Sequence, residues 1–287
     1  MEVLNTPEEM RRLCRRWSRE GRSIGLVPTM GALHEGHLTL ARAARKENER
    51  FVASIFVNPT QFENQEDFAR YARPFERDLE LLHEVGCDAV FAPSPEAMYG
   101  GEEFGDERPS LTFVEIEKLG EVFEGKARPG HFRGVATVVA KLFGIVGPDR
   151  AYFGEKDYQQ LKIIEQMVRD LFLDVEIIPC PTVREADGLA MSSRNVRLSP
   201  EEREAALALS RALRVGVALA EKGERDAARI TAEMQSVCEA EPLVEIKYVA
   251  VVHAETLEPL AVLDGSPARA LVSADVGRTH LIDNVSL

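Results

Sequence analysis

Alternation between apolar runs and amphipathic stretches constrains the fold of this 287-residue chain more than any other feature. Residues 23–27 form a short apolar run, and residues 51–57 are apolar without alternation, as in a strand that is covered on both faces. Between them, residues 37–49 place apolar side chains at helical spacing. The separation of the two runs is that of one strand–helix–strand unit with parallel strands.

The same alternation continues as far as residue 181. Further helices are predicted over residues 75–86, 134–146 and 158–171, and further strands over residues 87–93, 150–154 and 174–181. Strands and helices that alternate along a chain favour a parallel, doubly wound, Rossmann-like α/β sheet. Residues 99–110 are rich in glycine and acidic side chains, which predicts an exposed loop.

After residue 181 the order of elements changes. Helical patterns over residues 200–223 and 226–240 precede four strand-like stretches, which cover residues 245–254, 260–265, 269–276 and 278–287. Strands that cluster after helices indicate a smaller α+β domain. We therefore predict a Rossmann-like domain over residues 1–182 and a smaller C-terminal domain over residues 183–287.

Charge and cysteine content narrow the range of functions. The net charge of −13 argues against non-specific binding to nucleic acid, which requires a basic surface. The apolar runs are too short to cross a bilayer, and residues 1–14 lack the apolar core of a signal peptide, so we expect a cytoplasmic protein without a membrane partner. Four cysteines lie far apart without C-x-x-C spacing, as expected of reduced, structural thiols.

The segment over residues 25–37, GLVPTMGALHEGH, carries the strongest functional signal, and its two histidines allow three interpretations. His34 and His37 have a spacing found in zinc sites, although no third ligand is evident. A second interpretation is a structural pair at the start of a helix. In the third, Gly31 and Gly36 let a phosphate approach the helix N-terminus, where the imidazoles donate hydrogen bonds to it.

Two short strings resemble signatures of one superfamily. HEGH, at residues 34–37, resembles the HIGH motif of the nucleotidylyltransferases. MSSRN, at residues 191–195, resembles their KMSKS loop, which closes on the phosphates of ATP, with Arg194 keeping a positive charge there. By itself this second string also fits a plain polar turn.

Five longer strings, in order along the chain, resemble one family within that superfamily. They are PTMGALHEGH, FVNPTQF, RPGHFRGV, GPDRAYFGEKDYQQL and PTVREADGLAMSSRN. Together they resemble the pantothenate synthetase, or pantoate–β-alanine ligase, family. The resemblance runs from about residue 3 to the C-terminus and is densest over residues 25–195.

The resemblance implies a two-step, ATP-dependent condensation of (R)-pantoate with β-alanine. The pantoate carboxylate attacks the α-phosphorus of ATP and releases pyrophosphate, and the amine of β-alanine then opens the pantoyl adenylate to give pantothenate and AMP. ATP would enter as its Mg²⁺ complex, so no metal cage built by the protein is expected. The family also implies a homodimer.

Residue roles follow from the same resemblance. The catalytic residues would be His34, His37, Lys156 and Arg194. The ATP-binding set would comprise Met30, Gly31, His34, Gly36, His37, Gly154, Glu155, Lys156, Asp157, Val183, Met191, Ser192, Ser193 and Arg194. Pantoate would contact Gln61, Gln160 and Asn58, and β-alanine would contact Gln61. Further candidates are Tyr71, Arg128 and His131, whereas His83, His253 and His280 match no family position and are expected to be structural or exposed.

Two other functions stay open at this stage. One is a different adenylyl-transferring enzyme of the same superfamily, which activates another acid or joins AMP to a phosphate. The other is a non-catalytic nucleotide-binding regulator, because a fold does not determine a function. A tRNA-charging enzyme is disfavoured by the net charge of −13.

Overall fold

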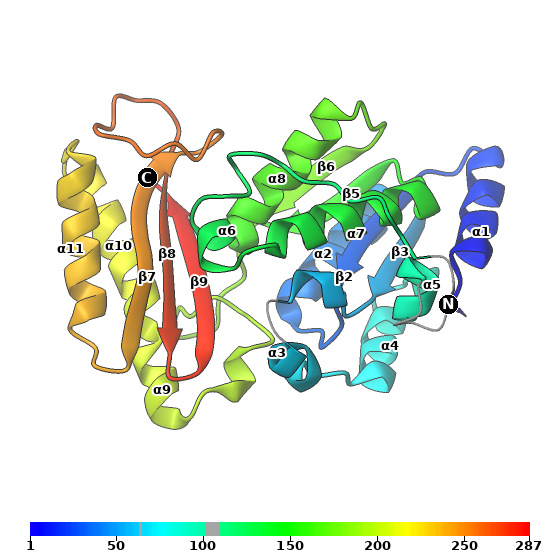
Figure 1. Cartoon of the computed structure of the whole chain (residues 1–287), viewed down its shortest axis with the longest axis horizontal. Coiled ribbons are helices and arrows are strands. Elements are labelled where there is room, and N and C mark those ends of the chain that lie inside the picture. Colours follow the sequence, from blue (N-terminus) through cyan, green and yellow to red (C-terminus); the bar gives the residue numbers. More distant parts are fainter. Residues whose placement is uncertain (63–64, 101–108) are drawn as a thin grey trace. The chain divides into compact units, whose positions relative to one another are not determined.

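The computed structural model describes residues 1–62, 65–100 and 109–287. Its contacts divide the chain into two units, residues 1–155 with 163–181, and residues 156–162 with 182–287. The first unit contains a six-stranded sheet and the second a three-stranded sheet (Figure 1). The boundary of 182/183 for two independently folding domains stays a prediction.

The sheet of the first unit is parallel throughout its described pairs, as the sequence predicts. Its strand order is β1-β4-β3-β2-β5-β6. The strands are β1 (Glu2–Leu4), β2 (Ile24–Thr29), β3 (Arg50–Ile55), β4 (Ala89–Phe91), β5 (Arg150–Gly154) and β6 (Glu176–Cys180). All but β1 were predicted within a few residues. β1 has three residues, too few to show a period in the sequence.

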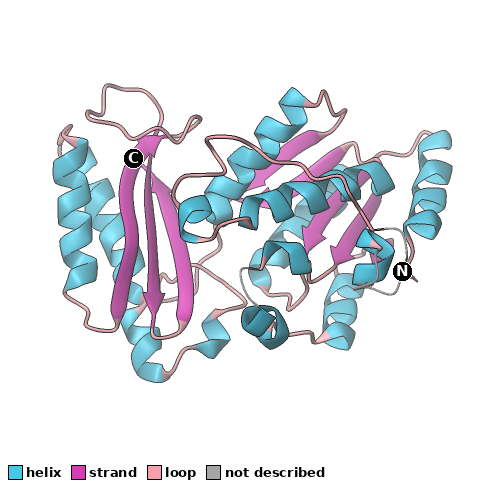
Figure 2. Ribbon diagram, viewed as in Figure 1, coloured by secondary structure: helices cyan, strands magenta, loops and turns pink. Residues whose placement is uncertain are grey.

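Helices connect these strands and cover the sheet (Figure 2). They are α1 (Pro7–Arg19), α2 (Glu35–Glu47), α3 (Gln65–Arg70), α4 (Phe75–Glu84), α5 (Pro95–Tyr99), α6 (Glu124–Ala127), α7 (His131–Val146) and α8 (Tyr158–Asp170), with the 3-10 turns η1 (Pro59–Gln61) and η3 (Glu155–Asp157). The predicted loop over residues 99–110 is wrong at its first residue, because Tyr99 ends α5 and is buried. Residues 101–108 of that loop lie outside the described residues.

The core of the first unit lies on both faces of the sheet. On one face, Val27, Phe51 and Val90 pack with apolar residues of α2 and α4. Leu26 and Val52 point to the opposite face and are fully buried as well. Both α1 and α7 contact β2, so burial on two faces explains why these strands read as continuous apolar runs.

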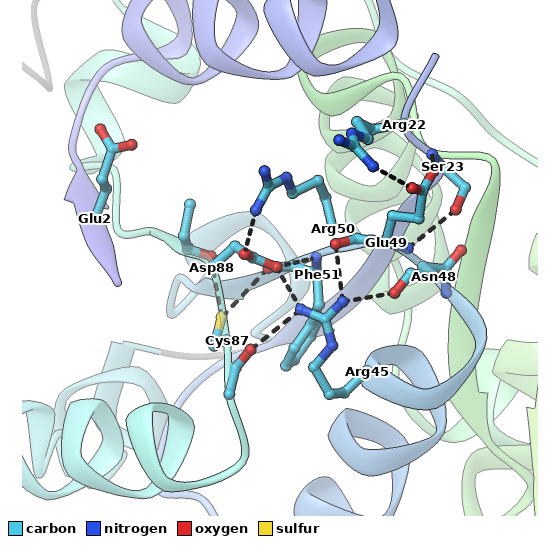
Figure 3. Close-up of polar contacts among 12 residues, drawn as sticks. Glu2, Arg22, Ser23, Arg45, Asn48, Glu49, Arg50, Phe51, Cys87 and Asp88 are labelled. Atoms are coloured by element: carbon cyan, nitrogen blue, oxygen red, sulfur yellow. Dashed lines mark hydrogen bonds and ion pairs between the residues drawn. The ribbon is translucent and has the colours of Figure 1, made fainter. Parts of the chain in front are cut away.

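A polar network ties the strands together at the end where β3 and β4 begin (Figure 3). Asp88 accepts hydrogen bonds from Arg45 of α2 at 2.6 Å, from Arg50 at 3.0 Å and from the backbone N–H of Phe51 at 2.8 Å. These contacts join one helix and two strands through a single carboxylate. They lie at the edge of the sheet opposite to the carboxyl ends of the strands.

The second unit packs helices against an antiparallel sheet. It contains η4 (Asn195–Arg197), α9 (Pro200–Ala205), α10 (Leu207–Glu221), α11 (Ala227–Glu239), β7 (Val244–His253), β8 (Ala268–Val276) and β9 (Thr279–Ser286). Residues of α10, α11, β8 and β9 share one apolar core, which confirms the predicted α+β architecture.

Two predictions in this unit need correction. The helix predicted over residues 200–223 is divided at Ala206 into α9 and α10. The strand predicted over residues 260–265 does not join the sheet. Leu260 donates one backbone hydrogen bond to the carbonyl of Val251 in β7, but the following residues bond to the turn before α11, where Ala227 donates to the carbonyl of Ala261 and Leu263 donates to that of Arg225. Residues 261 and 262 are exposed, whereas Leu260 and Leu263 are half-buried and pack against the core of the second unit.

All four cysteines are free and buried, as the sequence predicts for structural thiols. Burial raises the pKa of Cys14 and Cys87 to about 12, and that of Cys180 and Cys238 to about 11. These thiols are therefore protonated at neutral pH and unsuited to nucleophilic chemistry. Within the described residues, no helix has both the length and the apolar character needed to cross a membrane.

Candidate functional site

The carboxyl ends of β2 and β5 mark the expected ligand site of the first unit. From β2 the chain passes through α2 to β3 on one side, whereas β5 pairs with β2 on the other side. Ligands of open parallel sheets bind where neighbouring strands leave in opposite directions. The HEGH loop follows β2 at this point, and Gly154 ends β5 beside it, with Glu155 next in the chain.

The loop between β2 and α2 has a fixed backbone. Thr29 Oγ1 donates to the carbonyl of Ser54 at 2.6 Å and accepts from the backbone N–H of Gly31 at 3.1 Å. Gly31 has a φ of +79°, and an added Cβ would lie 2.9 Å from Asp78 Oδ2. Only glycine meets both the conformation and the close approach, which accounts for Gly31 in the motif.

Asp78 of α4, which belongs to none of the five strings, holds the same loop. Its carboxylate accepts hydrogen bonds from the backbone N–H groups of Ala32 and Leu33, both at 2.8 Å. Ala32 needs such support because its φ of +51° is unfavourable for a residue with a side chain. Asp78 is 1% exposed, and its burial raises the pKa of the carboxyl.

His34 and His37 lie together at the start of α2, with ring centroids 4.1 Å apart. His34 Nδ1 accepts from the backbone N–H of Gly36 at 3.1 Å, and His37 Nδ1 accepts from that of His34 at 3.4 Å. Because both Nδ1 atoms are acceptors, each neutral imidazole carries its proton on Nε2. The structure thus gives two Nε2–H donors at a helix N-terminus, a geometry suited to phosphate oxygens.

A second group of predicted residues is joined by hydrogen bonds near Met30. Gln61 Nε2 donates to Met30 Sδ at 3.2 Å, and Asn58 Nδ2 donates to Gln61 Oε1 at 2.9 Å. His131 Nδ1 lies 2.8 Å from the carbonyl oxygen of Gln61, and Arg128 lies 3.4 Å from His131 Nε2. The structure therefore brings together five residues that come from three separate motifs.

Tyr71, another predicted residue, is buried in the first unit. It is 6% exposed, and its ring packs edge-on against Phe62 at a centroid distance of 5.8 Å.

In the second unit, residues of the GEKD motif follow β5 directly. Lys156 Nζ lies 3.4 Å from Asp157 Oδ1, and the carbonyl of Lys156 accepts from Asn284 Nδ2 at 2.9 Å. Asp157 immediately precedes α8, and Gln160 lies in its first turn. The backbone of the predicted phosphate-binding lysine is thus fixed by β9.

The MSSRN loop follows the second arm of a short hairpin in the second unit, in which Arg184 pairs with Ala190. Met191 donates a backbone hydrogen bond to the carbonyl of Val183 at 2.9 Å. Glu185 of the first arm accepts from Asn195 Nδ2 and from Arg203, both at 2.7 Å, so the end of the loop is joined to the hairpin. Ser192, Ser193 and Arg194 form the turn between these anchors, with Ser192 Oγ accepting from the backbone N–H of Arg194.

The three histidines outside the motifs have the structural or exposed positions that were predicted. His83 is exposed, and His253 Nδ1 accepts from backbone N–H groups of the following turn. His280 lies 2.7 Å from Asp275 and 3.4 Å from Ser273 Oγ, which has the order of a catalytic triad. Ser273 is 0% exposed, however, so no substrate reaches its hydroxyl.

Zinc was one of the open interpretations of the histidine pair. Within residues 1–62, 65–100 and 109–287, no group of three or more His, Cys, Asp or Glu side chains is arranged to hold a metal ion. Both Nδ1 atoms of the pair are occupied by backbone donors.

A family model described as pantoate-beta-alanine ligase matches residues 2–286. The chain belongs to the pantoate–β-alanine ligase family. This finding confirms the family indicated by the five strings, and with it an enzyme rather than a regulator as the type of protein.

Individual members of the pantoate–β-alanine ligase family are similar over nearly their full lengths. A pantothenate synthetase of Rubrobacter xylanophilus is 60% identical, with 99% of this chain and 98% of that protein covered. One of Moorella thermoacetica is 55% identical, with 100% and 99% covered.

Solved structures of the family support the fold. The pantothenate synthetase of Thermus thermophilus matches with a TM-score of 0.91 at 48% identity, covering 99% of both chains. A pantoate–β-alanine ligase of Francisella tularensis, complexed with beta-gamma ATP and beta-alanine, matches with a TM-score of 0.80 at 33% identity, covering 100% of this chain and 97% of that one.

Proposed function

We propose that this protein condenses (R)-pantoate with β-alanine through a pantoyl-adenylate intermediate, with release of pyrophosphate and AMP. The observation that carries the proposal is the pair of Nε2–H donors at the N-terminus of α2, at the carboxyl end of β2. Family membership supplies the reaction, and the donor pair fits the charge that develops on phosphate oxygens when a carboxylate attacks the α-phosphorus.

The chemistry explains why ATP is needed. A carboxylate is a poor acyl donor because an oxide would have to leave. Attack of a pantoate oxygen on the α-phosphorus forms a P–O bond, expels pyrophosphate and leaves a mixed anhydride. The β-alanine nitrogen then attacks the acyl carbon, AMP leaves with the bonding electrons, and the amine loses a proton.

ATP contacts are proposed for both units separately. In the first unit these are Met30, Gly31, His34, Gly36, His37, Gly154 and Glu155. In the second unit they are Lys156 on the phosphates, Asp157 on the ribose hydroxyls, Val183 near the adenine, and Met191, Ser192, Ser193 and Arg194 on the phosphates. Mg²⁺ is proposed as part of the substrate, since it binds phosphate oxygens and retains several waters.

The acid is proposed to bind at the amides of Asn58 and Gln61, with Gln160 as a further contact and with β-alanine also meeting Gln61. Asn58 and Gln61 are 1% and 8% exposed, and they are hydrogen-bonded to one another. Neutral amides can orient a carboxylate and hydroxyls without neutralising the nucleophile. Tyr71, Arg128 and His131 are proposed to complete the walls of this site.

The test is exchange of label between pyrophosphate and ATP, which requires only the first step. Exchange should depend on pantoate and proceed without β-alanine. Dependence on a different acid would assign another adenylyl-transfer reaction, and exchange that never occurs would refute the adenylate.

His37→Asn tests the role of the imidazole without removing the helix cap. The asparagine oxygen can still accept the backbone N–H of His34, but the distal Nε2–H donor is lost. Exchange should fall on the order of 10²–10³-fold with an unchanged melting temperature. His83→Ala, at an exposed histidine, is the matched control and should exchange like wild type. Full activity of His37→Asn would exclude the proposed role.

A homodimer is also proposed, with the end of α8 as a contact. Phe172 is 93% exposed and has a φ of +51°, a position at a helix C-terminus where glycine is usual. Leu171 beside it is 51% exposed, and β6 is an edge strand. An exposed aromatic ring on a strained backbone contributes no stabilising burial within the monomer, so a second copy of the chain is the proposed partner that covers it.

Molar mass from light scattering tests this proposal. The wild-type protein should be a dimer, and Phe172→Gly should dissociate more readily although relief of the positive φ stabilises its fold. A monomeric wild type would refute the dimer, and a variant dimer of unchanged affinity would place the interface elsewhere. A cytoplasmic location is proposed from the four reduced, buried thiols.

A further inference from the structure

We propose that Tyr99 is a positioning residue that sets the orientation of the Gln61 amide, acting through Asn58. The inference rests on the proposed function, in which Gln61 binds the pantoate carboxylate. Tyr99 ends α5 and belongs to none of the five motifs that indicated the family. Its role is argued from the hydrogen bonds that surround two neighbouring amides.

The first step is the orientation of Asn58. Tyr99 OH donates to Asn58 Oδ1 at 2.7 Å, and Thr60 Oγ1 donates to the same oxygen at 3.0 Å. The Asn58 Nδ2 group donates to the carbonyl of Gly134 at 3.2 Å. If this amide flipped, its oxygen would face the carbonyl of Gly134 and its NH₂ group would face the backbone N–H of Thr60, so the observed orientation is favoured, and the two hydroxyl groups donate to the oxygen in that orientation.

The second step passes this orientation to Gln61. Asn58 Nδ2 donates to Gln61 Oε1 at 2.9 Å, which fixes the oxygen of the Gln61 amide on the Asn58 side. Gln61 Nε2 consequently points toward Met30, whose sulfur lies 3.2 Å away. A thioether is a weak acceptor, so a carboxylate competes with it easily for the N–H groups of Gln61. A flipped Gln61 would instead present an oxygen to the pantoate anion and repel it.

The side chain of Tyr99 is fixed by burial and by ring contacts. It is 6% exposed, its ring lies 5.0 Å from Lys141 Nζ, and its centroid is 6.3 Å from that of Phe56. Burial raises the pKa of the Tyr99 hydroxyl to about 12, which keeps it protonated as a donor over the whole range of an enzyme assay. A fixed ring with a permanent O–H donor is what the relay requires.

Removing this hydroxyl should weaken the orientation without abolishing the fold. In Tyr99→Phe, the oxygen of Asn58 keeps the hydroxyl and backbone N–H of Thr60. The loss of one neutral hydrogen bond corresponds to roughly a threefold to tenfold change. This change should appear in the KM for pantoate and not in that for ATP, because the pantoate carboxylate is proposed to accept from the Gln61 amide and ATP is not assigned to Gln61.

The experiment compares Tyr99→Phe with Tyr152→Phe in steady-state kinetics. Tyr152 is also a buried, hydrogen-bonded tyrosine of the first unit, but its hydroxyl contacts Glu47 and Asn48 rather than the amide pair. For Tyr99→Phe we expect a pantoate KM raised threefold to tenfold with an unchanged KM for ATP. For Tyr152→Phe we expect both KM values to stay as in wild type, whatever happens to stability.

Two further variants make every outcome decisive. Thr60→Val removes the second hydroxyl donor to Asn58 and should raise the pantoate KM in the same direction, so the relay stays testable if Tyr99→Phe folds poorly. Gln61→Ala tests the underlying assignment. If Gln61→Ala raises the pantoate KM while Tyr99→Phe and Thr60→Val do not, the relay is refuted alone. If Gln61→Ala leaves it unchanged, the assignment of the pantoate site fails.

Discussion

Replacing Gly134 with alanine should displace the turn that carries Gln61. Gly134 lies in the first turn of α7, and a Cβ there would be 2.4 Å from the carbonyl oxygen of Thr60 and 2.7 Å from the backbone nitrogen of Gln61. These neighbours are backbone atoms, which cannot rotate away. Reaching an ordinary contact distance requires that α7 and η1 separate by about 1 Å.

The magnitude follows from this displacement. A misplacement of about 1 Å in a binding group can lower kcat/KM on the order of 10²-fold, so we expect that loss for pantoate. Overpacking should also cost about 1–3 kcal/mol of unfolding free energy, of which the higher helix propensity of alanine offsets less than about 1 kcal/mol. The KM for pantoate should rise more than that for ATP, because His34 and His37 lie on a different loop.

Gly144→Ala is the matched control within the same helix. No atom lies within 4 Å of a Cβ at Gly144, and the residue is exposed. This variant should gain about 0.5–1 kcal/mol of stability and keep wild-type kinetics. Thermal denaturation and steady-state kinetics on both variants are sufficient. If Gly134→Ala kept both its melting temperature and its kcat/KM for pantoate, the close contact of α7 with η1 would be disproved.

Further predictions concern the two carboxylates that hold backbone segments. Asp78→Asn should lose about 1–3 kcal/mol of unfolding free energy and raise the KM for ATP. The amide can accept from only one of the backbone N–H groups of Ala32 and Leu33 and turns its NH₂ toward the other. Unchanged kinetics would show that the carboxylate is not needed for ATP binding. Because burial raises the pKa of Asp78, the folded state binds its proton more tightly than the unfolded state does. The stability advantage of wild type over Asp78→Asn should therefore shrink as pH rises above about 4. Urea titrations at several pH values test this, and an advantage that grows with pH would contradict it. Asp88→Ala should lose about 1–3 kcal/mol of unfolding free energy in urea denaturation, since its Arg partners are one-third exposed. Its kinetics should stay as in wild type, because the Asp88 network lies at the edge of the sheet opposite to the carboxyl ends of the strands. Loss of activity at wild-type stability would contradict this expectation.

The sequence predicted the sheet well because burial on both faces leaves a direct record. Strands β2 and β3 have no polar alternation, and the helix between them has a regular apolar spacing. The strand predicted over residues 260–265 shows the limit of the same rule. Its apolar composition fits a strand, but after one bond from Leu260 to Val251 its backbone pairs with Arg225 and Ala227, and no local pattern specifies that partner.

Some residues of the candidate site could be predicted from the sequence, and others could not. Residues within contiguous motifs, such as His34 and His37, could be selected from the sequence because their spacing is itself the signal. Asp78 and Tyr99 could not be selected in this way, since Asp78 contacts a loop 46 residues away along the chain and Tyr99 contacts a residue 41 positions away. One usable signal was present for Asp78, because a loop with an alanine between Gly31 and the histidines needs an acceptor for its backbone N–H groups.

Amide direction is the property that sequence alone is least able to supply. The sequence is the same whichever way the amides of Asn58 and Gln61 point, yet only one orientation directs N–H donors toward a carboxylate. In this protein the choice follows from hydroxyl groups on η1 and α5 and from the carbonyl of Gly134 on α7. The proposed specificity for an anionic acid therefore depends on η1, α5 and α7 together. Changes in α5 or α7 should alter pantoate binding before they alter ATP binding.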